Sequence, residues 1–136
     1  MTIVVDASVA VKWVVPEPGS EAAGALHGDE LIAPSLWLVE AANALWRLVL
    51  QGELIAEQAS ARLVELASAP VTSLPIEPHL RVALQLGIEL HHPIYDCLYL
   101  AVALHHDTQV VTADRCFVAA VGNSPHADRV RLLGRG

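Results

Sequence analysis

Four acidic residues interrupt stretches of this chain that are otherwise apolar, and they are its most informative feature. They are Asp6, Glu40, Asp96 and Asp114. An unpaired carboxylate is costly to bury, and acidic side chains are rarely buried without a partner. Few cationic residues lie near them in the sequence, so we expect a positive charge supplied from outside the chain. A hard divalent ion, Mg²⁺ or Mn²⁺, is the simplest candidate because such ions prefer oxygen ligands.

A cluster of carboxylates around such an ion suits phosphoryl chemistry. The ion can deprotonate a water molecule and hold a phosphate oxygen. An all-oxygen set of acids does not suggest zinc. Without the metal, mutual repulsion should raise the pKa of one or more of the acids.

The elements that must position these acids alternate between strand and helix. We predict strands over residues 2–6, 31–33, 71–74, 109–112 and 129–133. We predict helices over residues 8–15, 20–27, 36–50, 56–68, 77–90, 93–105 and 115–121. Strands separated by helices imply an α/β fold whose mostly parallel sheet has helices on both faces. The length of 136 residues fits one domain, residues 1–136, without a linker or repeat.

In open α/β sheets, ligands bind beyond the carboxyl ends of the strands. Asp6 and Asp114 each follow a predicted strand, whereas Glu40 and Asp96 lie near the beginnings of helices that face the same edge. We therefore expect the four carboxylates to converge on one rim. Each acid also has a structural explanation: Glu40 in a solvated helix stripe, Asp96 at a helix dipole, and Asp6 and Asp114 at strand ends or caps.

The composition is apolar for a soluble chain, with 54% hydrophobic residues and a mean hydropathy of +0.45. No apolar run is long enough to span a bilayer, because Glu40, Asn43 and Arg47 interrupt the longest one. Asp6 also makes the first apolar stretch unlike a signal peptide. We expect a cytoplasmic protein that buries part of its apolar surface against a second copy or a partner. The net charge of −7 argues against a general nucleic-acid coat but not against a nuclease.

Four short stretches, taken in order, resemble the PIN-domain ribonucleases, and in particular the VapC-like toxins of bacterial toxin–antitoxin pairs. They span residues 4–9, 34–45, 95–101 and 111–117, with the sequences VVDASV, PSLWLVEAANAL, YDCLYLA and VTADRCF. The resemblance implies a PIN-like three-layer α/β/α sandwich with a mostly parallel central sheet of four to five strands. It also implies an Mg²⁺- or Mn²⁺-dependent endoribonuclease that forms a homodimer and is inhibited by a cognate antitoxin.

The resemblance also assigns roles to individual residues. Asp6 and Asp96 match the first and third acids of the family, which are its surest metal ligands. Glu40 and Asp114 would complete the acidic quartet, directly or through water. Small hydroxyl residues that border the site are matched by Ser8 and Thr112, and a polar position one turn after the second acid is matched by Asn43.

Several basic and aromatic residues have alternative roles in this scheme. The pair His91 and His92 lies where no catalytic residue is expected, and adjacent histidines point in different directions on a regular element. Contacts to the RNA backbone would come mainly from Lys12, Arg47 and Arg115. Three tryptophans are candidates for an antitoxin groove, for a dimer interface or simply for the core: Trp13, Trp37 and Trp46.

Other functions remain alternatives. A haloacid-dehalogenase-type phosphatase needs a second Asp two positions after the first, where this chain has Ser8. A phosphorylated receiver domain needs a late-strand lysine, and the only lysine here is Lys12. A non-toxin PIN-like nuclease, or a catalytically idle module that only binds a partner, would share the same fold.

Overall fold

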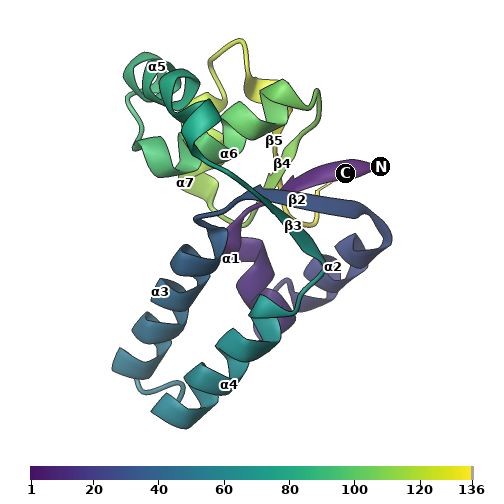
Figure 1. The fold of residues 1–136 in the computed structure, drawn as a ribbon, viewed down its shortest axis with the longest axis vertical. Coiled ribbons are helices and arrows are strands. Elements are labelled where there is room, and N and C mark those ends of the chain that lie inside the picture. The colour runs from purple at the N-terminus through teal and green to yellow at the C-terminus, as the bar shows by residue number, and fades with distance from the viewer. Residues whose placement is uncertain (136) are drawn as a thin grey trace.

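The computed structural model describes residues 1–135 and contains, within that range, one parallel sheet of five strands (Figure 1). The strands are β1 (Thr2–Val5), β2 (Glu30–Pro34), β3 (Val71–Leu74), β4 (Val110–Thr112) and β5 (Val130–Leu132). Their order across the sheet is β3-β2-β1-β4-β5. The chain therefore builds outward from β1 on one side and returns to build β4 and β5 on the other. Ligands of open α/β sheets bind at such a switch point, here between β1 and β4.

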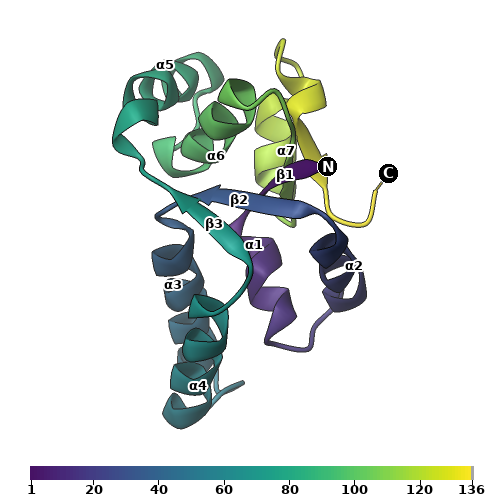
Figure 2. The same ribbon diagram turned by 45° about the vertical axis from the view of Figure 1, so that its right-hand side comes forward.

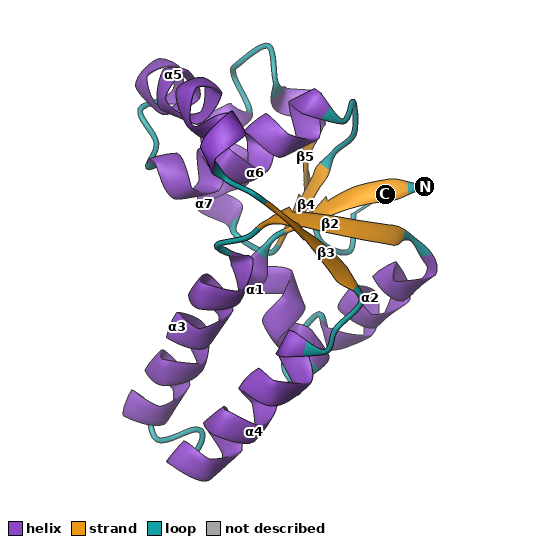
Figure 3. Cartoon of the chain, in the orientation of Figure 1, coloured by secondary structure: helices purple, strands orange, loops and turns teal. Residues whose placement is uncertain are grey.

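Helices cover both faces of the sheet, as predicted (Figure 3). One side carries α1 (Ala7–Ala10), α2 (Ser20–Ala25), α3 (Trp37–Leu50) and α4 (Ala56–Ala67), and the other carries α5 (Leu80–Leu90), α6 (Ile94–His105) and α7 (Arg115–Val121). Short 3-10 turns are η1 (Val11–Trp13), η2 (Leu26–Gly28), η3 (Glu77–His79) and η4 (Ala127–Arg129). Helices α3 and α4 form a hairpin that extends away from the sheet (Figure 2). The predicted α/β/α architecture with a parallel central sheet is confirmed.

The core lies where β1 and β4 meet helix α6. Strand β1 is a run of β-branched residues with Val4 and Val5 fully buried, as suits a central strand covered on both faces. Helix α6 is buried on all sides from Cys97 to Ala103. This helix therefore fixes the position of Asp96, which lies in its first turn, relative to the end of β1.

Three predicted helices contain a 3-10 turn in the structure, and the one predicted over residues 20–27 becomes η2 from Leu26. The helix predicted over residues 8–15 is four α-helical residues followed by the 3-10 turn η1. The helix predicted over residues 77–90 opens with η3, and its α-helical part begins at Leu80. Pro78 explains this start, because proline has no backbone N–H and favours the first positions of a helix.

The three tryptophans have different environments. Trp37 is a core residue whose Nε1 donates a hydrogen bond of 2.8 Å to Ser73 Oγ. Trp13 is half-buried, whereas Trp46 on α3 is 56% exposed. Only Trp46 is therefore largely open to solvent. None of the helices in residues 1–135 combines the length and apolar character needed to cross a membrane.

Candidate active site

The four predicted acids line one pocket of about 160 Å³ at the carboxyl ends of β1 and β4. Asp6 directly follows β1 and Asp114 caps α7 just after β4, whereas Glu40 and Asp96 lie in the first turns of α3 and α6. The remaining lining residues are Ala7, Ser8, Ala44 and Arg47. The convergence predicted from strand ends and helix beginnings is thus present in the fold.

Asp6 is the most buried of these acids, with 5% of its surface exposed. Its Oδ2 accepts hydrogen bonds from Thr112 Oγ1 at 2.6 Å and from Ser8 Oγ at 2.9 Å. Burial raises the pKa of Asp6 to about 6, and repulsion from Asp96 adds to the effect, while the two hydroxyl donors oppose it. Ionisation of the Asp6 carboxyl is therefore less favourable than that of an ordinary aspartate.

The two hydroxyl groups also join the ends of β1 and β4. Ser8 Oγ accepts a hydrogen bond of 3.0 Å from the backbone N–H of Ala113, and Thr112 Oγ1 accepts one of 3.0 Å from that of Asp114. Each hydroxyl thus donates to Asp6 and accepts from the segment after β4. This network explains why small hydroxyl residues stand at positions 8 and 112.

Glu40 is held by a residue that sequence reasoning did not identify. Tyr99 Oη, from α6, donates a hydrogen bond of 2.6 Å to Glu40 Oε1. Burial raises the pKa of Glu40 to about 7; Tyr99 opposes this shift, and repulsion from Asp6 and Asp96 adds to it. Burial and the same negative surroundings raise the pKa of the Tyr99 phenol well above its usual range, so it remains a donor.

Asp96 is held by His92, which we did not assign a role from the sequence. His92 Nε2 lies 2.6 Å from Asp96 Oδ2. Burial raises the pKa of Asp96 and repulsion from Asp114 adds to it, whereas the hydrogen bond and charge of His92 lower it. The His92 ring stacks on Phe117, with ring centroids 5.6 Å apart and planes at 12°.

The turn after α5 explains why only one histidine of the pair faces the site. His91 adopts a left-handed conformation, with φ of 52°, and ends α5, which leaves its side chain exposed. The next residue then turns back, and the His92 N–H donates 3.1 Å to Gly87 O. A Cβ atom at Gly87 would lie 3.0 Å from His92 O, so glycine permits this close approach.

Two predicted residues differ from the others: Asp114 has a second role as a helix cap, and Asn43 lies outside the pocket. Asp114 also caps α7, because its Oδ1 accepts a hydrogen bond of 2.9 Å from Cys116 N, which was the structural alternative for this residue. Asn43 is exposed and is not among the residues that line the pocket. From α3, the pocket is instead lined by Glu40, Ala44 and Arg47.

The donor set of the pocket fits a hard cation. Carboxylate oxygens are the ligands that Mg²⁺ and Mn²⁺ prefer, and a cation would relieve the mutual repulsion that helps raise the pKa values of Asp6, Glu40 and Asp96. In the part of the chain that the structure describes, however, no group of three or more His, Cys, Asp or Glu side chains is already arranged to hold a metal ion.

Comparison with known families places this site in context. Residues 3–130 match the family model of the PIN domain. The chain belongs to the PIN domain family. PIN domains are typically nucleases. The acidic pocket lies beyond the carboxyl ends of β1 and β4, where an active site is expected in a fold of this kind. None of the curated proteins compared with the chain matches it.

Solved structures share the PIN fold of this chain. PAE2754 from Pyrobaculum aerophilum is 27% identical, with a TM-score of 0.65 over 88% of this chain and 79% of the other. A toxin–antitoxin complex from Klebsiella pneumoniae is 13% identical, with a TM-score of 0.66 over 95% of each chain. FitAcB from Neisseria gonorrhoeae is 17% identical, with a TM-score of 0.63 over 97% of this chain and 96% of the other.

Proposed function

We propose that this PIN domain protein is an Mg²⁺- or Mn²⁺-dependent endoribonuclease and the toxin of a toxin–antitoxin pair. The observation that carries the proposal is the meeting of four carboxylates in one pocket at the switch point of the sheet. Asp6 and Asp96 would hold the principal ion, and Glu40 and Asp114 would orient water or a second ion. When bound, the ion would activate water and neutralise charge on the phosphate.

The residues of the chain supply orientation and proton transfer. Ser8 and Thr112 fix the Asp6 carboxylate through one oxygen, and His92 does the same for Asp96. Glu40, whose carboxylate Tyr99 holds in place, is suited to accept the proton of the attacking water. In-line attack on the phosphodiester would release a 3′-hydroxyl, without a covalent enzyme intermediate.

Apolar surface supports the proposed antitoxin and homodimer partners. A cleft of about 280 Å³ between α3 and α4 is lined by Leu45, Trp46, Val49 and Leu63 among others. This cleft supports Trp46, of the three candidate tryptophans, as a residue of an antitoxin groove or a dimer interface. The Klebsiella pneumoniae relative of the same fold is described as a toxin–antitoxin complex, which supports an antitoxin partner. We expect the pair to act in the cytoplasm, where its RNA substrate would be.

Cleavage of RNA by the purified protein tests the proposed activity. With Mn²⁺ present, the wild-type chain should cut single-stranded RNA, and EDTA should stop the reaction. Asp6→Asn and Asp96→Asn should each abolish cleavage while the protein stays folded by circular dichroism. Asp128→Asn, which makes the same change at an exposed acid away from the pocket, should cut at the wild-type rate. Wild-type rates in either pocket variant would refute the assignment.

Two further measurements separate the alternatives. Mn²⁺ should raise the melting temperature of the wild-type protein, whereas a catalytically idle binding module would show neither this rise nor cleavage. Expression in a bacterial host should arrest growth, and co-expression of a small neighbouring open reading frame should restore it. Cleavage without growth arrest would indicate a non-toxin PIN nuclease.

A further inference from the structure

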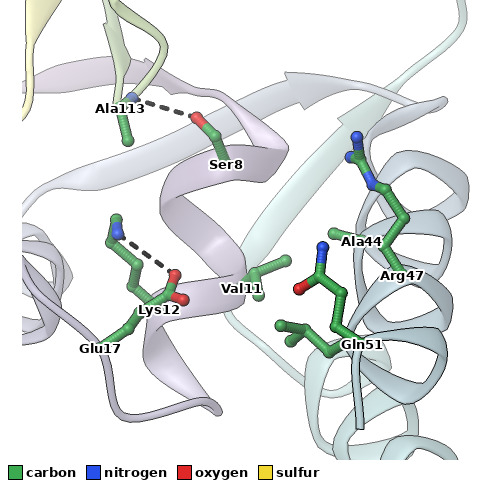
Figure 4. Close-up of a pocket in the computed structure, with 9 residues that line it drawn as sticks. Ser8, Val11, Lys12, Glu17, Ala44, Arg47, Gln51 and Ala113 are labelled. Atoms are coloured by element: carbon green, nitrogen blue, oxygen red, sulfur yellow. Dashed lines mark hydrogen bonds and ion pairs between the residues drawn. The ribbon is translucent and has the colours of Figure 1, made fainter. Parts of the chain in front are cut away.

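A second and larger pocket opens beside the acidic one. Its volume is about 340 Å³, and it shares Ser8, Ala44 and Arg47 with the acidic pocket. Arg47 and Gln51 come from α3 and its end on one side, and Ser8 and Lys12 come from the α1–η1 segment on the other (Figure 4). The two pockets therefore lie side by side, with Ser8, Ala44 and Arg47 between them.

The pocket is lined by two cationic residues and by one acid, Glu17, which pairs with one of them. The chain has 8 lysines and arginines against 15 acidic residues, yet both Lys12 and Arg47 line this space. Lys12 is already engaged, because its Nζ donates 2.7 Å to Pro18 O and lies 3.2 Å from Glu17 Oε1. Arg47 is exposed, and within residues 1–135 its guanidinium forms no hydrogen bond or ion pair. Arg47 is therefore the cation that remains available to a ligand between the two pockets.

The walls of the pocket combine this charge with apolar and hydrogen-bonding surface. Val11, Ala44 and Leu48 supply apolar side chains, and the Gln51 amide can both donate and accept. The volume is at the lower end of the range for small-ligand sites, which suits one nucleotide rather than several. In a nucleotide, the phosphate would match the charge of Arg47, the flat face of the base would match the apolar side chains, and the polar edge of the base would match the Gln51 amide.

We infer that this pocket holds one nucleotide of single-stranded RNA next to the scissile phosphate, with Arg47 contacting the phosphate that passes between the two pockets. The inference rests on the proposed ribonuclease activity, because the acidic pocket defines where the scissile bond lies. The free Arg47 beside that pocket favours a phosphate-bearing strand over an antitoxin peptide as the ligand. A strand lying across both pockets would place its backbone over Arg47 and one base between α1 and α3.

RNA binding without cleavage tests the inference. A fluorescent single-stranded oligonucleotide would be titrated into Asp96→Asn protein in EDTA at several salt concentrations, with fluorescence anisotropy as the readout. Adding Arg47→Ala should weaken binding about twofold to fivefold, the range expected for one exposed ion pair. It should also reduce the slope of log affinity against log salt by about 0.7, the value for one phosphate contact on a single strand. Arg47→Lys should restore part of the RNA affinity and part of the salt dependence.

Arg81→Ala is the matched control, since Arg81 is an exposed arginine on α5 whose loss changes the net charge equally. If Arg47→Ala binds RNA like Arg81→Ala, the inference is overturned even when the wild-type protein cuts RNA. If the wild-type protein cuts no RNA, the proposed function fails instead. In an otherwise wild-type chain, Arg47→Ala should raise KM more than it lowers kcat. If Arg47→Ala leaves RNA binding unchanged but weakens inhibition by the antitoxin, the pocket binds the protein partner, and the inference of an RNA site is overturned.

Discussion

The charge of Asp6 should make the metal-free protein less stable at neutral pH than an uncharged variant. The pKa of this buried acid is about 6 in place of 3.8, and each tenfold change in acidity corresponds to about 1.36 kcal/mol. Ionising Asp6 is therefore about 3 kcal/mol less favourable in the folded state than in the unfolded chain. Asn at this position carries no charge, yet its carbonyl oxygen can still accept the hydrogen bonds of Ser8 and Thr112. Asp6→Asn should consequently be more stable at pH 7.5 by up to about 3 kcal/mol.

The pH dependence identifies the cause of this gain. A folded-state pKa above the unfolded value means that the native protein keeps the proton longer, so its contribution to stability is present below pH 3.8 and is lost as the pH rises through about 6. The difference between Asp6→Asn and wild type should therefore be large at pH 7.5 and small at pH 4. Loss of the Asp6 charge should also make Glu40 easier to ionise, which adds to the gain at pH 7.5 and not to that at pH 4.

Urea unfolding in EDTA measures this difference at the two pH values, with the free energy of unfolding obtained by linear extrapolation. Asp128→Asn, at an exposed acid, should match the wild type at both. With Mn²⁺ in place of EDTA, the wild type should gain stability and the Asp6→Asn protein should not. An Asp6→Asn protein that is no more stable at pH 7.5, or that gains equally at pH 4, would refute the idea that a buried charge destabilises this site.

Three further substitutions test the surroundings of the site and the core. Tyr99→Phe removes the donor to Glu40, so the pKa of Glu40 should rise further above 7 and the rising limb of the pH–rate profile for RNA cleavage should move to higher pH. His92→Phe keeps an aromatic ring but removes the partner of Asp96. The Mn²⁺ concentration for half-maximal thermal stabilisation should then rise about 10-fold to 100-fold, and the same change at the exposed histidine before it should have no effect. Leu66→Ala empties a fully buried position of α4 and should lower the urea-derived free energy of unfolding by about 2–5 kcal/mol.

Most of the fold follows from local patterns in the sequence. The β-branched run before Asp6 specifies a buried strand, and α7 begins and ends at the predicted residues, Arg115 and Val121. The order of the strands did not follow from these patterns, because it depends on which faces of the crossing helices pack against the sheet. The 3-10 turns at η1, η2 and η3 were also missed, since helical periodicity does not distinguish the two kinds of helix over one turn.

The acids of the site were predictable because a carboxylate in an apolar stretch is unusual by itself. Their partners were not, because Tyr99 occupies an apolar helix where a tyrosine is an ordinary core residue, and its partner Glu40 is 59 residues away. His92 required the left-handed turn at His91, which no local pattern indicated. For Asn43, the resemblance indicated a polar position one turn after the second acid, but the neighbouring elements place Ala44 against the pocket instead.

The hydrogen bonds of the pocket explain how four acids can share a small space before any cation binds. Asp6, Glu40 and Asp96 each accept side-chain hydrogen bonds at a single oxygen, from hydroxyls, a phenol and an imidazole respectively. These donors oppose the burial and repulsion that raise the three pKa values, but they do not cancel them. The carboxylates are therefore held in place while their charge remains only partly neutralised. A divalent cation should stabilise such a site more than one whose carboxylates are fully neutralised by protein donors. Binding removes the electrostatic repulsion that remains between the carboxylates in the folded protein.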